Sequence, residues 1–435
     1  MQRLPIIRCQ AHKITVMATK TTVRFFSIFV VSFLLFLFSG CVKDAVKGTR
    51  TYTIMTPILK ARSEVMADIN GNPTQSVEAA GKIYIKDNFI YLNEVDKGIH
   101  IIDNSNPSSP KQVAFLDIPG NLDVAVRGNT LYADMYGDLL ALDISDPKKA
   151  TVTKELKNFF WNRIYYSTPL ADSVIVGWTK RDTTVSVDFV EPVFGCATCG
   201  GDFVAFANAA QSVAKSNGTS GSLASMVLMN DYLYALREPH SVGIVNISEA
   251  SSPRLDTTFS AGFDLETVYP LENKLFLGSM SGMYMYDLTN PLVPVKLGEF
   301  SHGRACDPVV TDGEYAYVTL HAGTNCGGEA NELNVIDIKN LMSPVLVKSY
   351  ELTKPTGLCK DGDLLFICDG DSGVRLFDAS NAAALQQIKQ IPVQDPYDVI
   401  ATGDHLMVVA KDGLYQFDYS NTNDIRQLSF YAIKR

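Results

Sequence analysis

Leu139-Leu-Ala-Leu-Asp143-Ile-Ser-Asp-Pro147 is a short apolar run that ends in an aspartate and a polar turn. Six near-copies occur elsewhere in the chain, and they begin at Ile99, Val242, Met283, Leu333, Val374 and Leu414. The acidic or amide residue that ends each run is called its anchor, and the anchors are Asp103, Asp143, Asn246, Asp287, Asp337, Asp378 and Asp418. Consecutive anchors are 40, 103, 41, 50, 41 and 40 residues apart. A period near 40 predicts a repeat architecture.

Each unit has the pattern of four short strands joined by tight turns. Before Asp143, for example, the apolar runs Val124–Val126 and Leu131–Ala133 are separated by Gly128-Asn129, a pair that accepts positive φ. The anchor side chain suits the turn that follows, because Asp and Asn accept hydrogen bonds from backbone amides two residues on. Four antiparallel strands in about 40 residues form one propeller blade, so we predict an all-β propeller of four-stranded blades.

The number of blades depends on the gap of 103 residues between Asp143 and Asn246. The gap contains a degenerate unit, with Val174–Trp178, a polar turn, and Val185-Ser-Val-Asp188. If Asp188 is counted as an anchor, there are eight units, and we expect eight blades. Seven blades is the alternative, because this unit lacks the clear pattern of the others.

The seven phrases resemble the LVIVD repeat of bacterial β-propeller proteins. The resemblance covers about residues 81–435. It implies a closed propeller, and it implies little about activity, because many members of the family are lipoproteins without an assigned function. A lone four-stranded sheet would expose its edges and an apolar face, which agrees with blades stacked around an axis.

The composition limits the classes of function. The chain has 435 residues, of which 46% are hydrophobic and 20% are charged, so it has ample material for a core. Its formal net charge is −9, and its isoelectric point is near 5.2. We therefore expect no nucleic-acid partner, because a phosphate backbone is bound by a basic face.

The N-terminal segment predicts the cellular location of the protein. The apolar run Phe25–Phe38 is too short for a spanning helix and suits the core of a signal peptide. Ser39-Gly40-Cys41 resembles the lipobox of bacterial lipoproteins, which implies cleavage after residue 40 and lipidation of Cys41. Met17 is a second candidate start. Val42 after the cysteine, under the sorting pattern of Gram-negative bacteria, implies delivery to the outer membrane, on its periplasmic or its cell-surface face.

The rest of the chain divides into a tether and the propeller. Residues 41–80 form the lipidated N-terminus, a tether and an approach strand, with a strand expected at 52–58 and a short helix at 60–69. The propeller follows at 81–435, with an insertion at about 190–222 that projects from one face. Inserted loops carry function more often than the strands that hold them.

The mature chain contains six cysteines besides Cys41, and an even number in an exported protein favours disulfides. We expect Cys196 and Cys199 to form a disulfide within one loop, and Cys306 and Cys326 to form a disulfide between two loops. Cys359 and Cys368 suit either a cross-strand disulfide or two buried thiols. The alternative for the first pair is a redox or metal site. For the second pair it is a zinc site with His302 and His321, whose spacings suit ligands.

We expect no metal and no cofactor. The stretch from Asp369 to Gly373 resembles a calcium loop only briefly, because Val374 and Ser380 stand where the EF-hand pattern needs Gly and Glu. A hairpin turn is the better interpretation, since Asp412-Gly413 fills the same place in another unit. The sequence also contains no nucleophile elbow, zinc-protease motif, phosphate loop or dinucleotide fingerprint.

The site hypothesis uses propeller topology. The loops that enter each innermost strand gather around one mouth of the central channel. Here they contain acidic, basic and aromatic residues that could bind a cation, a glycan or a peptide, or could merely cap turns: Asp123, Trp161, Asn162, Asp264, Glu266, Arg304, Asp307, Tyr397 and Asp398.

Two functions follow from these observations. The first is a non-catalytic, lipid-anchored binding or scaffold module at the bacterial envelope, whose partner is the membrane through its anchor and an unknown protein, peptide or glycan. The alternative is an envelope hydrolase or lyase that acts on glycans through carboxylates at the channel mouth. Three or more acids within one substrate length would favour the enzyme. We prefer the binding module, since the sequence contains no catalytic motif.

Overall fold

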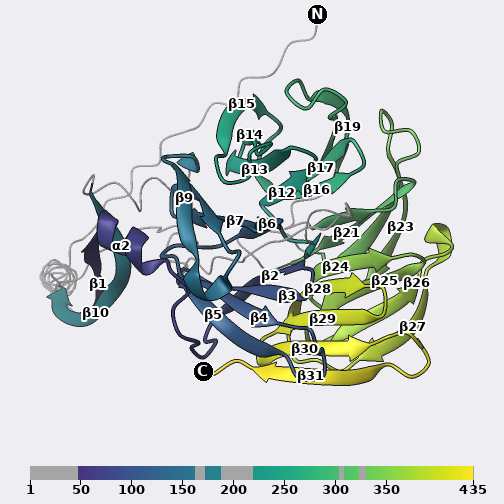
Figure 1. Cartoon of the computed structure of the whole chain (residues 1–435). Helices are drawn as coiled ribbons and strands as arrows, with labels where there is room; N and C mark the ends of the chain where they lie inside the picture. The colour runs from purple at the N-terminus through teal and green to yellow at the C-terminus, as the bar shows by residue number, and fades with distance from the viewer. Residues whose placement is uncertain (1–47, 162–171, 188–218, 303–307, 323–329, 435) are drawn as a thin grey trace, which may run out of the picture. The chain divides into compact units, whose positions relative to one another are not determined.

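The computed structural model describes residues 48–161, 172–187, 219–302, 308–322 and 330–434. Within these ranges, seven antiparallel sheets carry the repeat (Figure 1). Blade 1 consists of β2 (Ala80–Lys86), β3 (Phe89–Glu94), β4 (Gly98–Asp103) and β5 (Lys111–Asp117). Blade 2 consists of β6 (Val124–Arg127), β7 (Thr130–Met135), β8 (Asp138–Asp143) and β9 (Thr151–Leu156). Blade 3 consists of β12 (Met226–Met229), β13 (Tyr232–Glu238), β14 (Ser241–Asn246) and β15 (Arg254–Ser260).

Blades 4 to 7 follow the same order along the chain. Their strands are β16 (Leu265–Leu271), β17 (Lys274–Ser279), β18 (Gly282–Asp287) and β19 (Val295–Ser301); β20 (Val309–Thr311), β21 (Tyr315–Leu320), β22 (Glu332–Asp337) and β23 (Val345–Glu351); β24 (Pro355–Asp361), β25 (Leu364–Asp369), β26 (Val374–Asp378) and β27 (Gln386–Ile391); and β28 (Pro396–Thr402), β29 (His405–Ala410), β30 (Gly413–Asp418) and β31 (Arg426–Ala432).

The blades form a closed ring. The first strand of each blade contacts the first strand of the next, from β2 and β6 through to β24 and β28, and the ring closes where β29 of the last blade contacts β2. The apolar residues of the second and third strands are buried between neighbouring sheets, as Tyr132, Phe276 and Phe366 show. The all-β propeller predicted from the sequence is therefore confirmed.

Every anchor makes the predicted turn contact. The Oδ1 atoms of Asp103, Asp143, Asn246, Asp287, Asp337, Asp378 and Asp418 each accept a hydrogen bond of 2.8–3.0 Å from the amide two residues on. Just before each anchor, the pairing of the third and fourth strands shifts register. Such a bulge adds local twist, and its recurrence gives all seven blades the same shape.

The blade number is seven, the smaller of the two numbers that the repeat allows. The preferred number of eight is wrong because the degenerate unit builds no blade. Its strand β10 (Ser173–Val187) pairs instead with β1 (Gly48–Ala61) in a two-stranded sheet. Alternating apolar residues mark a strand, but they do not say which strand is its partner. Asp188 lies outside the described residues.

The chain divides into two compact units. One contains residues 48–54 and 181–187, the ends of β1 and β10, where Thr53 donates a hydrogen bond of 2.7 Å to Asp182. The other contains the seven blades, the rest of β1 and β10, and the helix α2 (Arg62–Asp68). The strand expected at 52–58 lies within β1, and the helix expected at 60–69 contains α2.

Ring closure uses side chains and not a strand from the N-terminus, because β28–β31 of the last blade all come from the C-terminal end. Asn104 of the first blade and Gln416 of the last exchange two amide hydrogen bonds of 3.0 and 2.7 Å. The hydroxyl of Tyr431 donates to Gln112 at 3.0 Å. No helix among the described residues is long and apolar enough to cross a bilayer.

Candidate functional site

One position of the repeat faces the axis of the ring. In six blades the first hairpin closes at a defined residue pair, such as Arg127 with Thr130 or Thr402 with His405. In each of these blades we consider the residue four positions before the first member of that pair. It lies in the innermost strand or in the loop that enters it. These axial residues are Lys82, Asp123, Ser225, Thr267, Gly357 and Asp398. The equivalent residues of blade 5 fall in the gap at 303–307.

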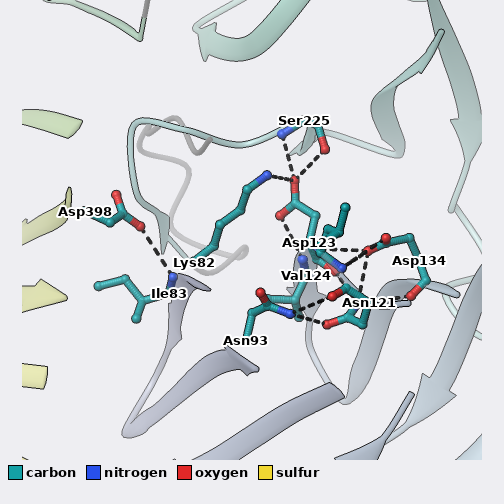
Figure 2. A network of polar contacts seen from close by, with 10 residues as sticks. Lys82, Ile83, Asn93, Asn121, Asp123, Val124, Asp134, Ser225 and Asp398 are labelled. Carbon is teal, nitrogen blue, oxygen red and sulfur yellow. Dashed lines mark hydrogen bonds and ion pairs between the residues drawn. The ribbon is translucent and has the colours of Figure 1, made fainter. Parts of the chain in front are cut away.

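Asp123 is the centre of a hydrogen-bonded network (Figure 2). Its Oδ2 atom accepts from the Lys82 ammonium at 2.8 Å, and from the amide and hydroxyl of Ser225 at 2.7 and 2.8 Å. Its Oδ1 atom accepts from the amide of Val124 at 2.8 Å. Lys82 and Asp123 are 4% and 2% exposed, so the axis holds a buried ion pair with each carboxylate oxygen satisfied.

A second layer holds the entry loop of β6 in place. The side-chain Nδ2 of Asn121 donates to the Asp134 carboxylate at 3.0 Å and to the backbone carbonyl of Asp123 at 2.9 Å. Asn93 donates to the Asn121 side-chain oxygen at 2.7 Å, and Asp134 accepts from the Asp123 amide at 2.7 Å. Asn93, Asn121 and Asp134 are all buried, so this layer fixes the position of Asp123.

Asp398 also lies at the axis, where its hydrogen-bond donors among the described residues are backbone amides. Its carboxylate accepts a long bond of 3.4 Å from the Ile83 amide and one of 3.1 Å from the Val399 amide. The carboxylate is fully buried, and this burial raises its pKa to about 7. The two backbone donors and the Lys82 charge offset only part of that shift. Asp398 therefore changes charge near neutral pH.

The segment before β12 crosses the mouth of the channel. The short strand β11 (Thr219–Ser220) pairs with β2 on its axial side, opposite Ile85 and Tyr84. The Ser222 hydroxyl accepts a hydrogen bond of 2.7 Å from the amide of Leu358 in blade 6, and Ser225 contacts Asp123 of blade 2. Residues 219–225, called the axial segment below, thus contact blades 1, 2 and 6 across the axis.

Small residues make room for this segment. A Cβ on Gly221 would lie 2.1 Å from Oδ1 of Asp398, and one on Gly357 would lie 2.6 Å from the Tyr397 carbonyl. Real Cβ atoms do not approach so closely, so the chain needs glycine at both places. The channel mouth is therefore filled by the chain itself, and Asp123 and Asp398 lie behind this filling.

The remaining mouth residues of the sequence hypothesis divide into four groups. Tyr397 lies beside the axis, and its hydroxyl donates to the Ala80 carbonyl, while burial raises its pKa well above the usual value. Asp264 and Glu266 are only half-buried, at a left-handed turn before β16 and within that strand. Trp161 is 61% exposed after β9 and lies outside the axial network. Asn162, Arg304 and Asp307 fall outside the described residues.

The sequence hypothesis did not include Lys82 and Ser225, because it selected mainly acidic and aromatic residues. The cation that pairs with Asp123 of the second blade is Lys82 of the first blade. The repeat itself contained the signal. Alignment of the seven units on their first hairpin turn places Lys82, Ser225 and Asp398 in the same column as Asp123. Among the described residues, the axis holds the buried ion pair of Lys82 and Asp123.

The cysteine predictions have one described outcome. Cys359 and Cys368 are free and fully buried, so the alternative of two buried thiols holds, and the cross-strand bridge between them is wrong. Burial raises the pKa of both thiols well above the usual value. Cys41, Cys196, Cys199, Cys306 and Cys326 lie outside the described residues, so those predictions stand as they were.

The hairpin interpretation of residues 369–373 is confirmed. Asp369 accepts hydrogen bonds of 2.7 Å from the amides of Thr353 and Lys354, and its other oxygen pairs with Arg375 at 3.1 Å. Gly373 has φ +70°, and a Cβ there would meet the Ile391 carbonyl at 2.3 Å. Among the described residues, no group of three acidic, His or Cys side chains could hold a metal ion.

The described residues line recesses on the outside of the ring, of which two are the following. One, of about 480 Å³, is lined by ten residues: Asp68, Asn72, Pro73, Gln75, Asp96, Lys97, Phe115, Asp117, Pro119 and Val176. Burial and the neighbouring Asp68 raise the pKa of Asp117 in this recess. The other, of about 310 Å³, lies between blades 2 and 3 and includes Lys154, Glu249 and Arg254. Both are polar surface recesses.

Comparison with known proteins supports the repeat and the fold. The family model of the LVIVD repeat matches residues 79–115, 121–153 and 302–352. No curated protein matches the chain in sequence. The computationally designed Ika8 protein has a TM-score of 0.51, with 9% identity over 84% of this chain and 92% of its own. A protein from Lactobacillus plantarum has a TM-score of 0.50, with 11% identity over 81% of this chain and 96% of its own. At such identities the likeness concerns the fold alone.

Proposed function

We propose that this chain, a seven-bladed propeller with LVIVD repeats, is a lipid-anchored binding or scaffold module of the bacterial envelope. In this proposal Cys41 carries the acyl chains, and the ring presents its outer surface to a protein, peptide or glycan partner. The protein then needs no cofactor. The outer membrane is the proposed location, on its periplasmic or its outer face.

The filled axis is the observation that carries the binding role. An enzyme that used the channel mouth would need its carboxylates exposed to substrate, within hydrogen-bond reach of the reacting atoms. Asp123 and Asp398 are instead 2% and 0% exposed, behind the axial segment. The ion pair with Lys82 further commits Asp123 to the structure. These facts weigh against the proposed alternative, a glycan hydrolase or lyase at the mouth.

The N-terminal sequence supports the proposed lipid-anchored location. The run Phe25–Phe38 followed by Ser39-Gly40-Cys41 has the order of a lipoprotein signal. Two or more acyl chains anchor a protein stably, because each buried methylene contributes about 0.8 kcal/mol. A propeller on such an anchor carries its connecting loops on the surface, which suits a binding role.

Mass spectrometry of the protein from its native membrane, without reduction and with or without surface proteolysis of whole cells, tests the address. The proposal expects a mature chain that begins at acylated Cys41. A soluble, unacylated chain would contradict it. Turnover of envelope glycans that disappears in Asp123→Asn or Asp398→Asn, with the fold intact, would restore the enzyme alternative.

A further inference from the structure

His100 of β4 is fully buried, and both of its ring nitrogens have a polar partner. Its Nε2 atom lies 3.0 Å from Oε2 of Glu94 in β3, which is 1% exposed. Its Nδ1 atom contacts the side-chain Nε2 of Gln112 in β5. An amide NH2 group donates hydrogen bonds and does not accept them, so Nδ1 is the acceptor and carries no proton. His100 is therefore neutral here, with its one ring proton on Nε2 and directed at Glu94.

Gln112 extends this arrangement across the boundary between blades 1 and 7, which we call the closing seam. The side-chain oxygen of Gln112 accepts a hydrogen bond of 3.0 Å from the hydroxyl of Tyr431 in β31. The pair of bonds between Asn104 and Gln416 crosses the same seam. The Tyr431 bond exists because the amide of Gln112 turns its nitrogen to His100 and its oxygen to the last blade.

Blade 6 repeats this arrangement with a permanent cation. In both blades an acid stands nine residues before the anchor, a base three before it and a glutamine nine after it. These residues are Glu94, His100 and Gln112 around Asp103, and Asp369, Arg375 and Gln387 around Asp378. Each acid also accepts two backbone amides from the loop that enters its blade. The two blades thus differ in whether the base can lose its charge.

Beside the permanent cation, the glutamine is turned the other way. Nε and Nη2 of Arg375 both donate to the side-chain oxygen of Gln387, at 3.0 and 2.7 Å. Tyr350 of blade 5 stands where Tyr431 stands in blade 7, thirteen residues after its anchor. Its hydroxyl accepts a hydrogen bond of 2.8 Å from the amide of Leu385. The boundary between blades 5 and 6, called the comparison seam below, therefore shows the arrangement beside a charged base.

Blade 1 offers Tyr431 no such amide. The residue that corresponds to Leu385, seven after the anchor, is Pro110, which has no backbone N–H. A charged imidazole donates from both nitrogens, so Gln112 then has to turn its oxygen to Nδ1 of His100, as Gln387 does to its arginine. The NH2 group then faces Tyr431, and the hydroxyl of Tyr431 loses its acceptor.

The charged groups around His100 leave the histidine as the group that titrates. Burial opposes the charged form of Glu94, but the bonds from His100 and from two loop amides outweigh it, so the pKa of Glu94 is lowered. Lys97 lies 3.8 Å from Glu94 and 2.5 Å from Glu78, at the exposed end of this cluster. Burial raises the pKa of both tyrosines on the side of blade 7, Tyr397 and Tyr431. Histidine is the side chain that ordinarily changes charge between about pH 5 and 8.

We propose that His100 makes the closing seam respond to pH. When acid adds a proton to Nδ1, the amide of Gln112 turns and the bond from Tyr431 is lost. The Asn104–Gln416 pair and the apolar contacts between the two blades remain, so the seam loosens and the ring stays closed. Removal of the proton restores the bond. This proposal is independent of lipidation at Cys41.

Hydrogen exchange of the mature protein tests the response at the seam itself. Asp398 of blade 7 accepts from the Ile83 amide of blade 1 and has a pKa of about 7, so every protein in the test carries Asp398→Asn. The exchange rates are divided by those of the unfolded chain at the same pH. From about pH 7.5 to about pH 5.5, we expect exchange in β5 and β31 to accelerate at least roughly threefold, the effect of one lost hydrogen bond. In β23 and β27, at the comparison seam, we expect no change. An equal response at both seams, or none at either, would overturn the proposal.

Two variants imitate the charged arrangement. His100→Arg copies blade 6, and Tyr431→Phe removes the hydroxyl alone, so it decides the outcome if the arginine variant does not fold. In both, β5 and β31 should exchange at either pH as fast as the Asp398→Asn protein does in acid. Tyr350→Phe, at the same position of the comparison seam, is the matched control and should leave the response of β5 and β31 intact. A Tyr431→Phe variant that still responds to pH, or a control that does not, would contradict the proposal.

The proton itself is observed by ring-nitrogen NMR of the histidines in the Asp398→Asn protein. The chain after Cys41 contains five histidines, and the spectrum of His100→Gln identifies the signals of His100. We expect a proton on Nε2 alone at about pH 7.5, and protons on both nitrogens at about pH 5.5. If exchange in β5 and β31 responds to pH while His100 keeps a single proton, another group controls the seam and the proposal is wrong.

Discussion

The ammonium of Lys82 in the first blade lies 2.8 Å from the carboxylate of Asp123 at the entry to the second, and both side chains are almost fully buried. The two residues occupy the same position of the repeat. Opposite charges at one repeat position therefore join neighbouring blades at the axis. Ser225, at the same position of the third blade, adds two hydrogen bonds to the same carboxylate oxygen.

Lys82→Met should destabilise the propeller, because it leaves the Asp123 carboxylate buried without its cation. Removal of one partner of a buried ion pair costs about 3–5 kcal/mol. Urea unfolding followed by circular dichroism measures the change. The double variant Lys82→Met with Asp123→Asn should recover part of the loss, since no charge remains buried. A single variant as stable as the parent protein would show that the pair contributes nothing.

Asp398→Asn should change the pH dependence of stability. The folded-state pKa of about 7 lies above the unfolded value of 3.8, so the folded protein binds the proton more tightly. Asp398 therefore lowers stability as the pH rises from about 4 to about 7, and the loss is complete above that. The variant should be more stable than the parent at pH 8 by roughly 1–3 kcal/mol, and about equal at pH 4. Identical pH profiles of the two proteins would contradict this account.

Gly221→Ala should displace the axial segment. Its Cβ would lie 2.1 Å from a carboxylate oxygen of Asp398, which is fixed between blades. Overpacking at such a place costs about 1–3 kcal/mol. The matched control is Gly177→Ala in β10, where the nearest atom would be Cδ1 of Ile58 at an ordinary 3.6 Å. Equal melting temperatures for both variants would show that Gly221 does not need its small size.

Asn104→Ala should weaken ring closure, because it removes both hydrogen bonds to Gln416 and leaves that fully buried side-chain amide without this partner. The expected loss is about 1–2 kcal/mol. Asn273→Ala is a control, since its bonds to Asp287 and Thr289 stay within one blade and are exposed. Hydrogen exchange should increase in β2–β5 and β28–β31 for the first variant alone. A uniform increase over all blades would contradict a local role.

Cys359 and Cys368 should resist alkylation in the native state and react once the protein unfolds in urea. Both thiols are fully buried, and burial raises the pKa of each. Residue-resolved mass spectrometry after iodoacetamide treatment, at neutral pH and without reductant, makes the comparison. A native-state mass two hydrogens lower on the peptides of this pair would instead reveal the cross-strand bridge.

The sequence was sufficient to predict the blades, because three local signals agree in all seven units: the apolar runs, the turn residues between them and the anchor residues. It also placed Asp123, Tyr397 and Asp398 near the axis. It could not give the blade number, since β10 has the alternation of a blade strand and a different partner. The filled mouth depends on Gly221, Ser222 and Ser225. Their contacts with Asp398, Leu358 and Asp123 are 102 or more residues away in the chain and leave no local pattern.

Amide hydrogen exchange of the axial segment tests most directly the claim that the chain fills its own channel. The amide of Gly221 donates to the Ile83 carbonyl at 3.4 Å, and that of Ser225 donates to Asp123 at 2.7 Å. We expect residues 219–225 to exchange as slowly as the inner strands β6 and β28. Exchange as fast as in the exposed turn at Asn106–Ser109 would show an open mouth, and the buried axial network would then be wrong.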